Sequence, residues 1–299
     1  HRRKVIFGIR GNTAKAELAF IVHRLVKGLD TAGIDYICEA EIATQIRKQF
    51  SLRLKAPKVA EEKELVKRCD FMISIGGDGT FLATAKLVGN RNIPIIGVNL
   101  GKLGFLAETS TREIVTFVKK VVKGDFLVDE RTVLEAVAVN GGNTRRVVHG
   151  MNEIVINQNE IVKTIDISVY FNNQLVNSYH ADGMIIATPT GSTGYSLSAG
   201  GPIVFPKTEV FILSPLSPHT LTARPVILPD NGVFKVKINS RVPINVVSDG
   251  NDIIKLGAPA VVELKKAPYK IKIAKDLDSN YFKVLTGKLL WGEDKRKKS

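Results

Sequence analysis

The chain has 299 residues, of which 44% are hydrophobic, and its formal net charge is +14. This length allows one large or two ordinary hydrophobic cores, and the apolar fraction is typical of a globular protein. Two cysteines, Cys38 and Cys69, are too few for a disulfide framework, so we expect buried free thiols. No His/Cys group has zinc spacing, and no apolar run approaches the ~20 residues that cross a bilayer.

The positive charge would suit nucleic acid or smaller polyanions such as nucleotides. The sequence has neither an aromatic-and-basic RNA signature nor helix-turn-helix spacing, and its densest basic block, Lys295–Lys298, reads as a solvated tail. The apolar run in the first residues is too short for a signal peptide. We therefore expect a soluble cytoplasmic protein with no nucleic-acid partner and no membrane partner.

The first part of the chain alternates strand-like and helix-like segments. Strands are predicted over 4–9, 36–39, 71–75 and 94–98, and helices over 17–29, after Gly79, and over 114–122. Residues 41–68 are charged and partly helical, with a flexible middle near 55–57. Alternation of this kind predicts a parallel sheet covered by helices on both faces.

After about Asp125 hydrophobic residues recur at every second position, the period of β-strands. Strands are predicted over 132–139, 164–170, 233–238, 244–247, 260–264 and 269–274, with turn signals such as Asn172-Asn173 between them. The fold class is therefore an N-terminal α/β domain with a parallel sheet, followed by an all-β domain. The expected boundaries are 1–125 and 126–276, and residues 277–299 are expected to return to the first domain.

A glycine-rich turn follows the strand predicted over 71–75. It contains Gly76, Gly77, Asp78, Gly79 and Thr80, and a helix is predicted directly after it. Strand, glycine turn and helix is how α/β proteins bind phosphate, because free N–H groups and the positive helix end face the ligand. An aspartate repels phosphate, so Asp78 suggests a metal ion or a hydroxyl proton. The plainer alternative is an aspartate that caps the helix.

Three further stretches have both plain and functional interpretations. Asn152-Glu153 precedes an apolar run and alone would suit a hairpin end. The stretch ADGMIIATPTGSTGYSLSAGGPI (181–203) is rich in glycine and hydroxyl side chains, which suits a nucleotide, and Tyr195 could stack on a ring. The stretch Ser248–Asn251 alone favours a plain β-turn.

Together these stretches resemble the NAD kinase family, and the resemblance covers most of the chain. The combination of GGDGT, NLGKLGFL (99–106), Asn152-Glu153, the Asp182-Gly183 pair, TPTGSTGYSLSAGGP and SPHTLTARP (217–225) is specific, whereas GGDGT alone also occurs in lipid kinases and phosphofructokinases. Two positions depart from the family pattern: Gly194 stands where alanine is usual, and Asn251 where many bacterial members have glutamine.

The resemblance implies transfer of the γ-phosphoryl of ATP to the 2′-hydroxyl of the adenosine ribose of NAD, with a divalent metal, expected to be magnesium, whose ligands the sequence does not identify. It implies that Asp78 accepts the hydroxyl proton and that Gly76, Gly77, Gly79 and Thr80 hold phosphate. It further implies a β-sandwich for the second domain and a homo-oligomer, a dimer or tetramer. The implied NAD-binding residues are Asp78, Gly79, Asn152, Glu153, Lys163, His180, Asp182, Thr193, Gly194, Tyr195, Ser196, Leu197, Ser198 and Asn251.

His180 occupies a position that varies within the family, and the variation is tied to acceptance of NADH. A bulky polar ring there predicts a preference for NAD, and the alternative is a residue that only caps a strand end. Two other functions stay open at this point. A lipid kinase of the diacylglycerol or sphingosine type would need an apolar substrate groove, and a non-catalytic dinucleotide-binding protein would not need Asp78.

Overall fold

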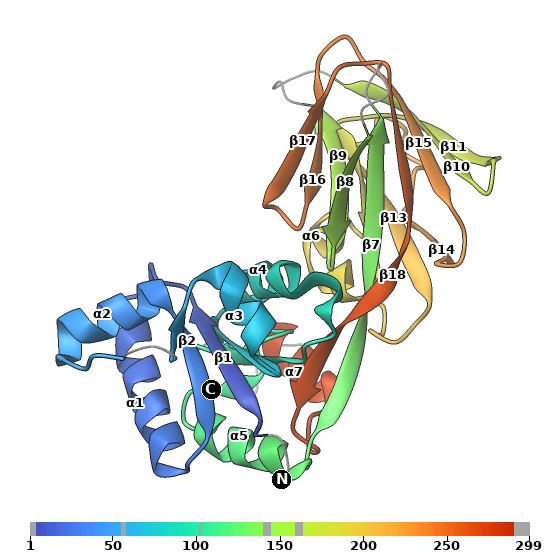
Figure 1. The fold of residues 1–299 in the computed structure, drawn as a ribbon. Helices are drawn as coiled ribbons and strands as arrows, with labels where there is room; N and C mark the ends of the chain where they lie inside the picture. Colours follow the sequence, from blue (N-terminus) through green and yellow to red (C-terminus); the bar gives the residue numbers. More distant parts are fainter. Residues whose placement is uncertain (1–3, 55–57, 102, 140–144, 159–163, 290–299) are drawn as a thin grey trace, which may run out of the picture. The chain divides into compact units, whose positions relative to one another are not determined.

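The computed structural model describes residues 4–54, 58–101, 103–139, 145–158 and 164–289. The chain forms two compact units, residues 1–130 with 271–299 and residues 131–270 (Figure 1). It passes from the first unit to the second within strand β7 (Leu127–Val139) and returns within strand β18 (Ala260–Lys275). The predicted flexible middle near 55–57 lies outside the described residues.

The first unit is built on a parallel sheet. Its strands have the order β18-β5-β4-β1-β2-β3, and every neighbouring pair is parallel. The elements are β1 (Ile6–Gly11), α1 (Leu18–Thr31), β2 (Asp35–Glu39), α2 (Ala40–Phe50), β3 (Val59–Ala60), α3 (Glu62–Arg68), β4 (Phe71–Gly76), α4 (Asp78–Val88), η1 (Gly89–Arg91), β5 (Ile95–Asn99), β6 (Thr109–Ser110), α5 (Ile114–Lys123) and α7 (Tyr281–Leu289).

Helices pack on both faces of this sheet because successive side chains of a strand point to opposite faces. Ile73 of β4 shares a buried cluster with Leu25 of α1 and Val118 of α5. The next residue, Ser74, points the other way, and its hydroxyl lies 2.8 Å from that of Thr84 in α4. The N-terminal glycine turn is therefore fixed between a fully buried strand and a helix that packs on the sheet.

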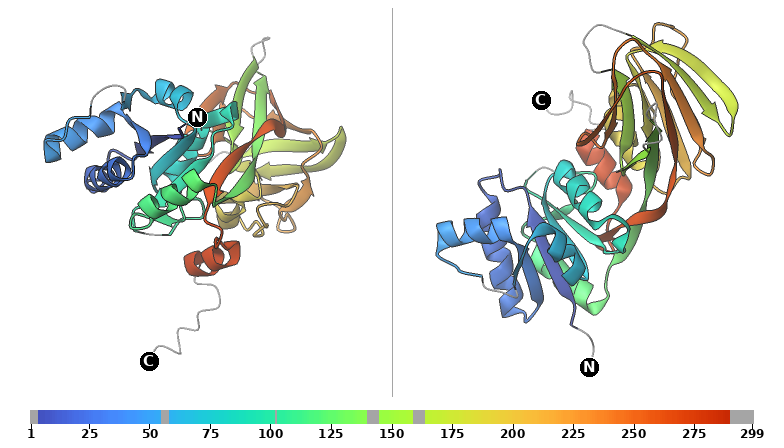
Figure 2. Two further views of the ribbon diagram at one scale, coloured as in Figure 1. Left: turned by 60° about the horizontal axis from the view of Figure 1, so that its bottom comes forward. Right: turned by 45° about the horizontal axis from the view of Figure 1, so that its top comes forward.

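The second unit is an antiparallel β-sandwich. One sheet has the order β14-β13-β12-β9-β16-β17, and the other contains β11-β10-β15-β18, with β7 paired to β18 and to β8. Its remaining elements are β8 (Arg145–Gly150), β9 (Glu153–Gln158), β10 (Ile165–Phe171), β11 (Gln174–Ala181), β12 (Gly183–Ala187), η2 (Thr190–Thr193), α6 (Tyr195–Ser198), β13 (Val210–Leu216), β14 (Val226–Pro229), β15 (Phe234–Asn239), β16 (Ile244–Ser248) and β17 (Asp252–Leu256). Figure 2 shows the same ribbon from two other sides.

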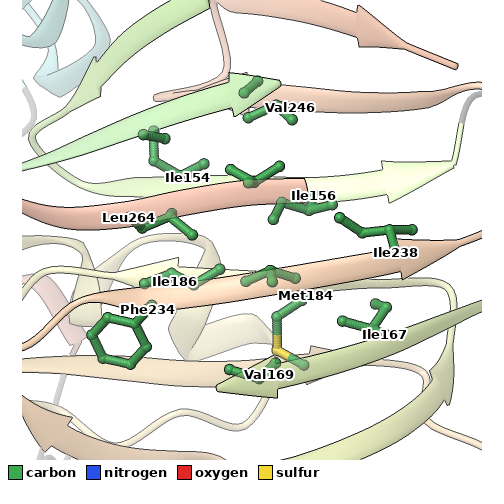
Figure 3. Close-up of a cluster of buried hydrophobic side chains, with 14 of the residues drawn as sticks. Ile154, Ile156, Ile167, Val169, Met184, Ile186, Phe234, Ile238, Val246 and Leu264 are labelled. Carbon is green, nitrogen blue, oxygen red and sulfur yellow. The ribbon is translucent and has the colours of Figure 1, made fainter. Parts of the chain in front are cut away.

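The core of the sandwich lies between the inner faces of the two sheets (Figure 3). Ile156, Met184 and Val246 come from the six-stranded sheet, and they share one buried cluster with Ile167 and Phe234 of the other. Alternation along each strand places these apolar residues inside and polar residues outside. This pattern is the period of two seen in the sequence after Asp125.

The predicted fold class, an α/β domain followed by an all-β sandwich, is confirmed. The split of residues 260–274 into two strands is wrong, because β18 continues through Pro268 as one strand. Several strands were not predicted, among them β11, whose residues are mostly exposed and show little buried alternation. Cys38 and Cys69 are buried free thiols, as expected. Within the described ranges, every helix is too short or too polar to cross a membrane.

Candidate active site

The carboxylate of Asp78 is held by a loop that follows strand β5. Its Oδ2 accepts the backbone N–H of Phe105 at 3.0 Å, and its Oδ1 accepts those of Leu106 at 2.9 Å and Ala107 at 3.3 Å. A carboxylate has about four acceptor positions, so roughly one is left for a further donor. Asp78 is the first residue of α4, and no side chain caps that helix end, so the helix-capping interpretation is wrong.

The glycines of the turn differ in what surrounds them. A Cβ on Gly76 would lie 2.3 Å from the hydroxyl of Thr80, so this position excludes any side chain. A Cβ on Gly77 or Gly79 would meet no atom within 4 Å, so the backbone there faces open space. Gly79 and Thr80 line a cavity of about 510 Å³ at the start of α4. Free N–H groups at a helix start bind phosphate well, which fits the role predicted for this turn.

In the second unit, the Asn152-Glu153 pair lies against another glycine-containing segment, the one that follows β12. Gly191 and Gly194 make this approach possible: a Cβ on Gly191 would lie 2.1 Å from the carbonyl oxygen of Asn152. A Cβ on Gly194 would lie 3.1 Å from Oε2 of Glu153 and 3.4 Å from Nδ2 of Asn152. Oδ1 of Asn152 and Oε2 of Glu153 are buried and have no hydrogen-bond partner. Buried acceptors without partners are rare in proteins, and here a ligand with hydrogen-bond donors would satisfy them.

Asp249 fixes the backbone of this pair from the turn between β16 and β17. Its Oδ2 accepts the N–H of Met151 at 2.8 Å, and its Oδ1 accepts those of Asn152 at 2.8 Å and Glu153 at 3.1 Å. Asp249 has φ 45° and the following Gly250 has φ 72°, so the stretch does form the tight turn that the sequence suggested. Asn251 belongs to this turn, and its Nδ2 donates to the carbonyl oxygen of Asp249 at 3.1 Å.

The carboxyl groups of Glu153 and Asp249 both have raised pKa values. The pKa of Glu153 is raised to about 7, first by burial and then by the charge of Asp249, while a backbone hydrogen bond from Tyr195 opposes the shift. Burial also raises the pKa of Asp249, against the N–H groups that it accepts. Near neutral pH, Glu153 can therefore accept or donate a hydrogen bond. Such shifts are frequent at functional sites.

The predicted residues 193–198 form a short segment that covers Glu153. The ring of Tyr195 is 48% exposed and free to stack on a ligand. The hydroxyl of Ser196 is buried and lies 3.2 Å from that of Ser214, which gives it a packing role. Thr193 and Leu197 are half-buried and Ser198 is exposed. The segment therefore offers Tyr195, Thr193 and Ser198 to a ligand and holds Ser196 inside.

Asp182 lies just before β12, and His180 is in β11, a strand of the other sheet. His180 Nδ1 lies 2.8 Å from Oδ1 of Asp166, and Nε2 lies 2.6 Å from the hydroxyl of Thr164, so the ring has a fixed orientation. In the register of β9 and β12, Gly183 pairs with Asn157 whereas Ala187 pairs with Glu153. Four residues of strand separate the two positions by roughly 14 Å. Asp182, the neighbour of Gly183, is thus not close to Asn152 and Glu153, and His180 lies two residues before it, in β11.

Comparison with known proteins decides the family. The model of the ATP-NAD kinase N-terminal domain matches residues 7–126, and that of the ATP-NAD kinase C-terminal domain matches residues 151–275. This chain belongs to the NAD kinase family. The NAD kinase of Flavobacterium psychrophilum is 38% identical over 277 residues, which are 92% of this chain and 94% of that protein. The NAD kinase of Chlorobium phaeobacteroides is 37% identical over 96% of this chain and 98% of its own.

Solved NAD kinase structures have the same fold. A yeast NADH kinase in complex with NADH superposes with a TM-score of 0.90 at 24% identity, covering 98% of this chain and 90% of that one. An NAD kinase from Archaeoglobus fulgidus in complex with ATP gives a TM-score of 0.74 at 25% identity, covering 96% and 99%. The chain is thus a kinase of the NAD kinase family, with an α/β domain and a β-sandwich.

Two supporting residues of the site were not predicted from the sequence. Gly104 allows the Asp78 carboxylate to approach its loop, and Asp249 fixes residues 151–153. The NLGKLGFL and SDGN stretches were both noticed, but a contact across 96 to 98 residues leaves no local signal. Lys163, another predicted NAD-binding residue, lies outside the described residues.

Proposed function

We propose that this chain transfers the γ-phosphoryl group of ATP to the 2′-hydroxyl of the adenosine ribose of NAD. The oxygen of that hydroxyl forms the new bond to phosphorus, and the bond between the γ-phosphorus and the bridging oxygen breaks, which releases ADP. The hydroxyl proton passes to the carboxylate of Asp78. In such transfers the protein mainly positions groups and stabilises charge.

The geometry of Asp78 is the observation that carries this proposal. Three backbone N–H groups hold its carboxylate in one orientation and leave about one acceptor position for a donor such as a hydroxyl. A general base needs this kind of fixed hydrogen-bonding reach toward the proton it removes. The neighbouring Gly79 and Thr80 line the cavity at the start of α4, which suits the phosphates of the donor.

The second unit supplies the proposed NAD-binding residues. Asn152 and Glu153, with their unpartnered buried oxygens, are suited to the amino and hydroxyl groups of the adenosine part, and Tyr195 can stack on a ring. Asp182 adjoins Gly183, which lies roughly 14 Å along β12 from the position paired with Glu153, and His180 lies two residues before Asp182. That separation suits the other end of an extended dinucleotide, the nicotinamide end.

A divalent metal, most simply Mg²⁺, would neutralise the phosphates of the donor. Within the described ranges no group of three His, Cys, Asp or Glu side chains could hold a metal ion. Mg²⁺ is commonly held by one or two carboxylates together with substrate phosphates, so a carboxylate of this chain with the phosphates of the donor would suffice to hold it. We further propose, from the family resemblance, a cytoplasmic homo-oligomer.

One assay tests the proposed reaction. Purified chain is incubated with NAD, ATP and Mg²⁺, and NADP is measured with an NADP-specific dehydrogenase. We expect NADP to form only when both NAD and ATP are present. We expect no phosphorylation of diacylglycerol or sphingosine in parallel reactions. Tight binding of NAD without any NADP would instead support the non-catalytic dinucleotide-binding alternative.

A further inference from the structure

The cavity at the start of α4 lies at the reversal point of the parallel sheet. With the order β18-β5-β4-β1-β2-β3, the chain winds in one direction from β1 and in the other from β4. Open α/β sheets bind ligands outside the carboxyl ends of the strands at such a point. The lining fits this rule, since it comes from the ends of β1 and β2 and from the starts of α2, α3 and α4: Arg10, Gly11, Asn12, Thr13, Glu39, Glu41, Glu61, Glu62, Gly79, Thr80 and Ala83.

The charges of this lining are unequally distributed. Four carboxylates and one guanidinium leave a formal charge of −3 if all are ionised. The carboxylates belong to the end of β2, the start of α2 and the start of α3, whereas Gly79 and Thr80 belong to the start of α4. Phosphate is therefore favoured on the β4 side of the cavity, and a neutral hydrogen-bond donor on the β2 side.

Glu39, the last residue of β2, has an incompletely satisfied carboxylate. Its side chain is 13% exposed, and its Oε2 is buried and has no hydrogen-bond partner. Nε of Arg10 is 3.8 Å away, too far for a hydrogen bond, because the guanidinium binds Glu62 instead and reaches Thr84 at 3.4 Å. Burial raises the pKa of Glu39 to about 7, with Arg10 opposing the shift and Glu62 and Glu41 adding to it.

We propose that Glu39 binds the ribose hydroxyls of the phosphoryl donor and so selects a nucleoside triphosphate over inorganic polyphosphate. An acidic residue in dinucleotide-binding folds of this strand order binds ribose hydroxyls in the same way. Because β1 lies between β2 and β4, the strand ends that carry Glu39 and the glycine turn are about 10 Å apart, which a triphosphate chain can span. Inorganic polyphosphate has no hydroxyl donor for Glu39, and its charge would face the acidic side. This inference rests on the proposed function, since it places the donor at the same turn.

The test measures binding of three probes in Mg²⁺ by calorimetry, without NAD: ATP, 2′,3′-dideoxy-ATP and inorganic tripolyphosphate. Wild-type chain should bind ATP about 10- to 100-fold more tightly than dideoxy-ATP, as expected for hydrogen bonds to a charged group. In Glu39→Ala the ratio should fall to near one, and tripolyphosphate should bind more tightly than it does to wild type. Glu39→Gln keeps an acceptor oxygen and should give an intermediate ratio, which also covers the case in which Glu39→Ala does not fold.

Glu61→Gln is the matched control, because it removes the same charge from the same cavity without touching Glu39 or Arg10. It should leave the ratio for ATP and dideoxy-ATP unchanged. Equal affinity of wild-type chain for the two nucleotides, the same ratio in Glu39→Gln as in wild type, or no ATP binding at all would overturn the inference. If NADP forms from ATP and the ratio is nevertheless one, only the role of Glu39 fails. If no NADP forms, the proposed function itself fails.

Discussion

Gly104 and Asp78 lie so close together that a Cβ on Gly104 would be 2.2 Å from Oδ1 and 3.0 Å from Cγ of Asp78. The glycine is therefore needed for the carboxylate to reach the N–H groups of residues 105–107. The orientation of the proposed base, Asp78, therefore depends on Gly104, a residue 26 positions away that has no reactive side chain.

Gly104→Ala should therefore displace the Asp78 carboxylate and lower turnover by about 100-fold or more, the range lost when a general base is removed. The measurement is the rate of NADP formation, with thermal unfolding as a check on the fold. Gly287→Ala is the control, because a Cβ there would only make an ordinary 3.7 Å contact with Leu103. Near-normal turnover of Gly104→Ala would show that the carboxylate does not need its present orientation.

Asp249 should be essential for the stability of the second unit. In Asp249→Ala the three N–H groups of residues 151–153 lose their acceptor, and an unsatisfied buried donor costs about 1–3 kcal/mol, so the loss should be on the order of 3 kcal/mol after relaxation. Chemical denaturation measures it, and NAD affinity should fall as well. Asn251→Ala in the same turn should have little effect on the free energy of unfolding, because it removes only one hydrogen bond of an exposed side chain. A similar, small loss in both variants would mean that the Asp249 contacts contribute little.

Glu153 should make stability decrease as pH rises. Its folded pKa of about 7 is above the ordinary value of 4.5, so the folded chain binds more protons between these values. The stabilisation of the folded chain by the proton on Glu153 is fully present below pH 4.5 and is lost as pH rises through 7. Glu153→Gln removes it, so the melting temperature of the variant relative to wild type should be higher at pH 8 than at pH 5. An unchanged difference between the two pH values would contradict the raised pKa.

His180 should influence the choice between NAD and NADH. Its ring is fixed by Asp166 and Thr164, and a bulky polar ring near the nicotinamide can distinguish the charged oxidised form from the neutral reduced form. His180→Gly should shift the ratio of kcat/KM for NAD and NADH several-fold toward NADH. Ser178→Gly, two residues earlier on the same strand face, is the control. If both variants keep the wild-type ratio, the preference is set elsewhere in the protein.

The sequence predicted those parts of the fold that depend on local patterns. The strand, glycine turn and helix around Asp78 are present, and Asn172 and Asn173 take the positive φ values of a hairpin turn, 47° and 66°. Proline usually marks a strand end, yet β18 runs through Pro268, between the two strands that were predicted.

The candidate site was predictable in residue identity but not in geometry. The motifs indicated Asp78 and Asn152-Glu153, partly through the family resemblance. They did not show that both Asp78 and Asp249 are held by three consecutive backbone N–H groups, because those groups are 27 to 29 and 96 to 98 residues away. Nor could composition reveal that the hydroxyl of Ser196 is buried against Ser214. Contacts of this kind follow from tertiary packing alone.

The most direct test of the central claim is the turnover of Asp78→Asn measured together with its affinity for NAD. Asparagine has nearly the same shape and keeps one acceptor oxygen, but it cannot take the proton of the 2′-hydroxyl. We expect an intact fold, NAD binding close to that of wild type, and NADP formation slowed by about 100- to 10,000-fold. Near-normal NADP formation by Asp78→Asn would contradict the account, because it would remove Asp78 from the chemistry and leave its carboxylate with a purely structural role.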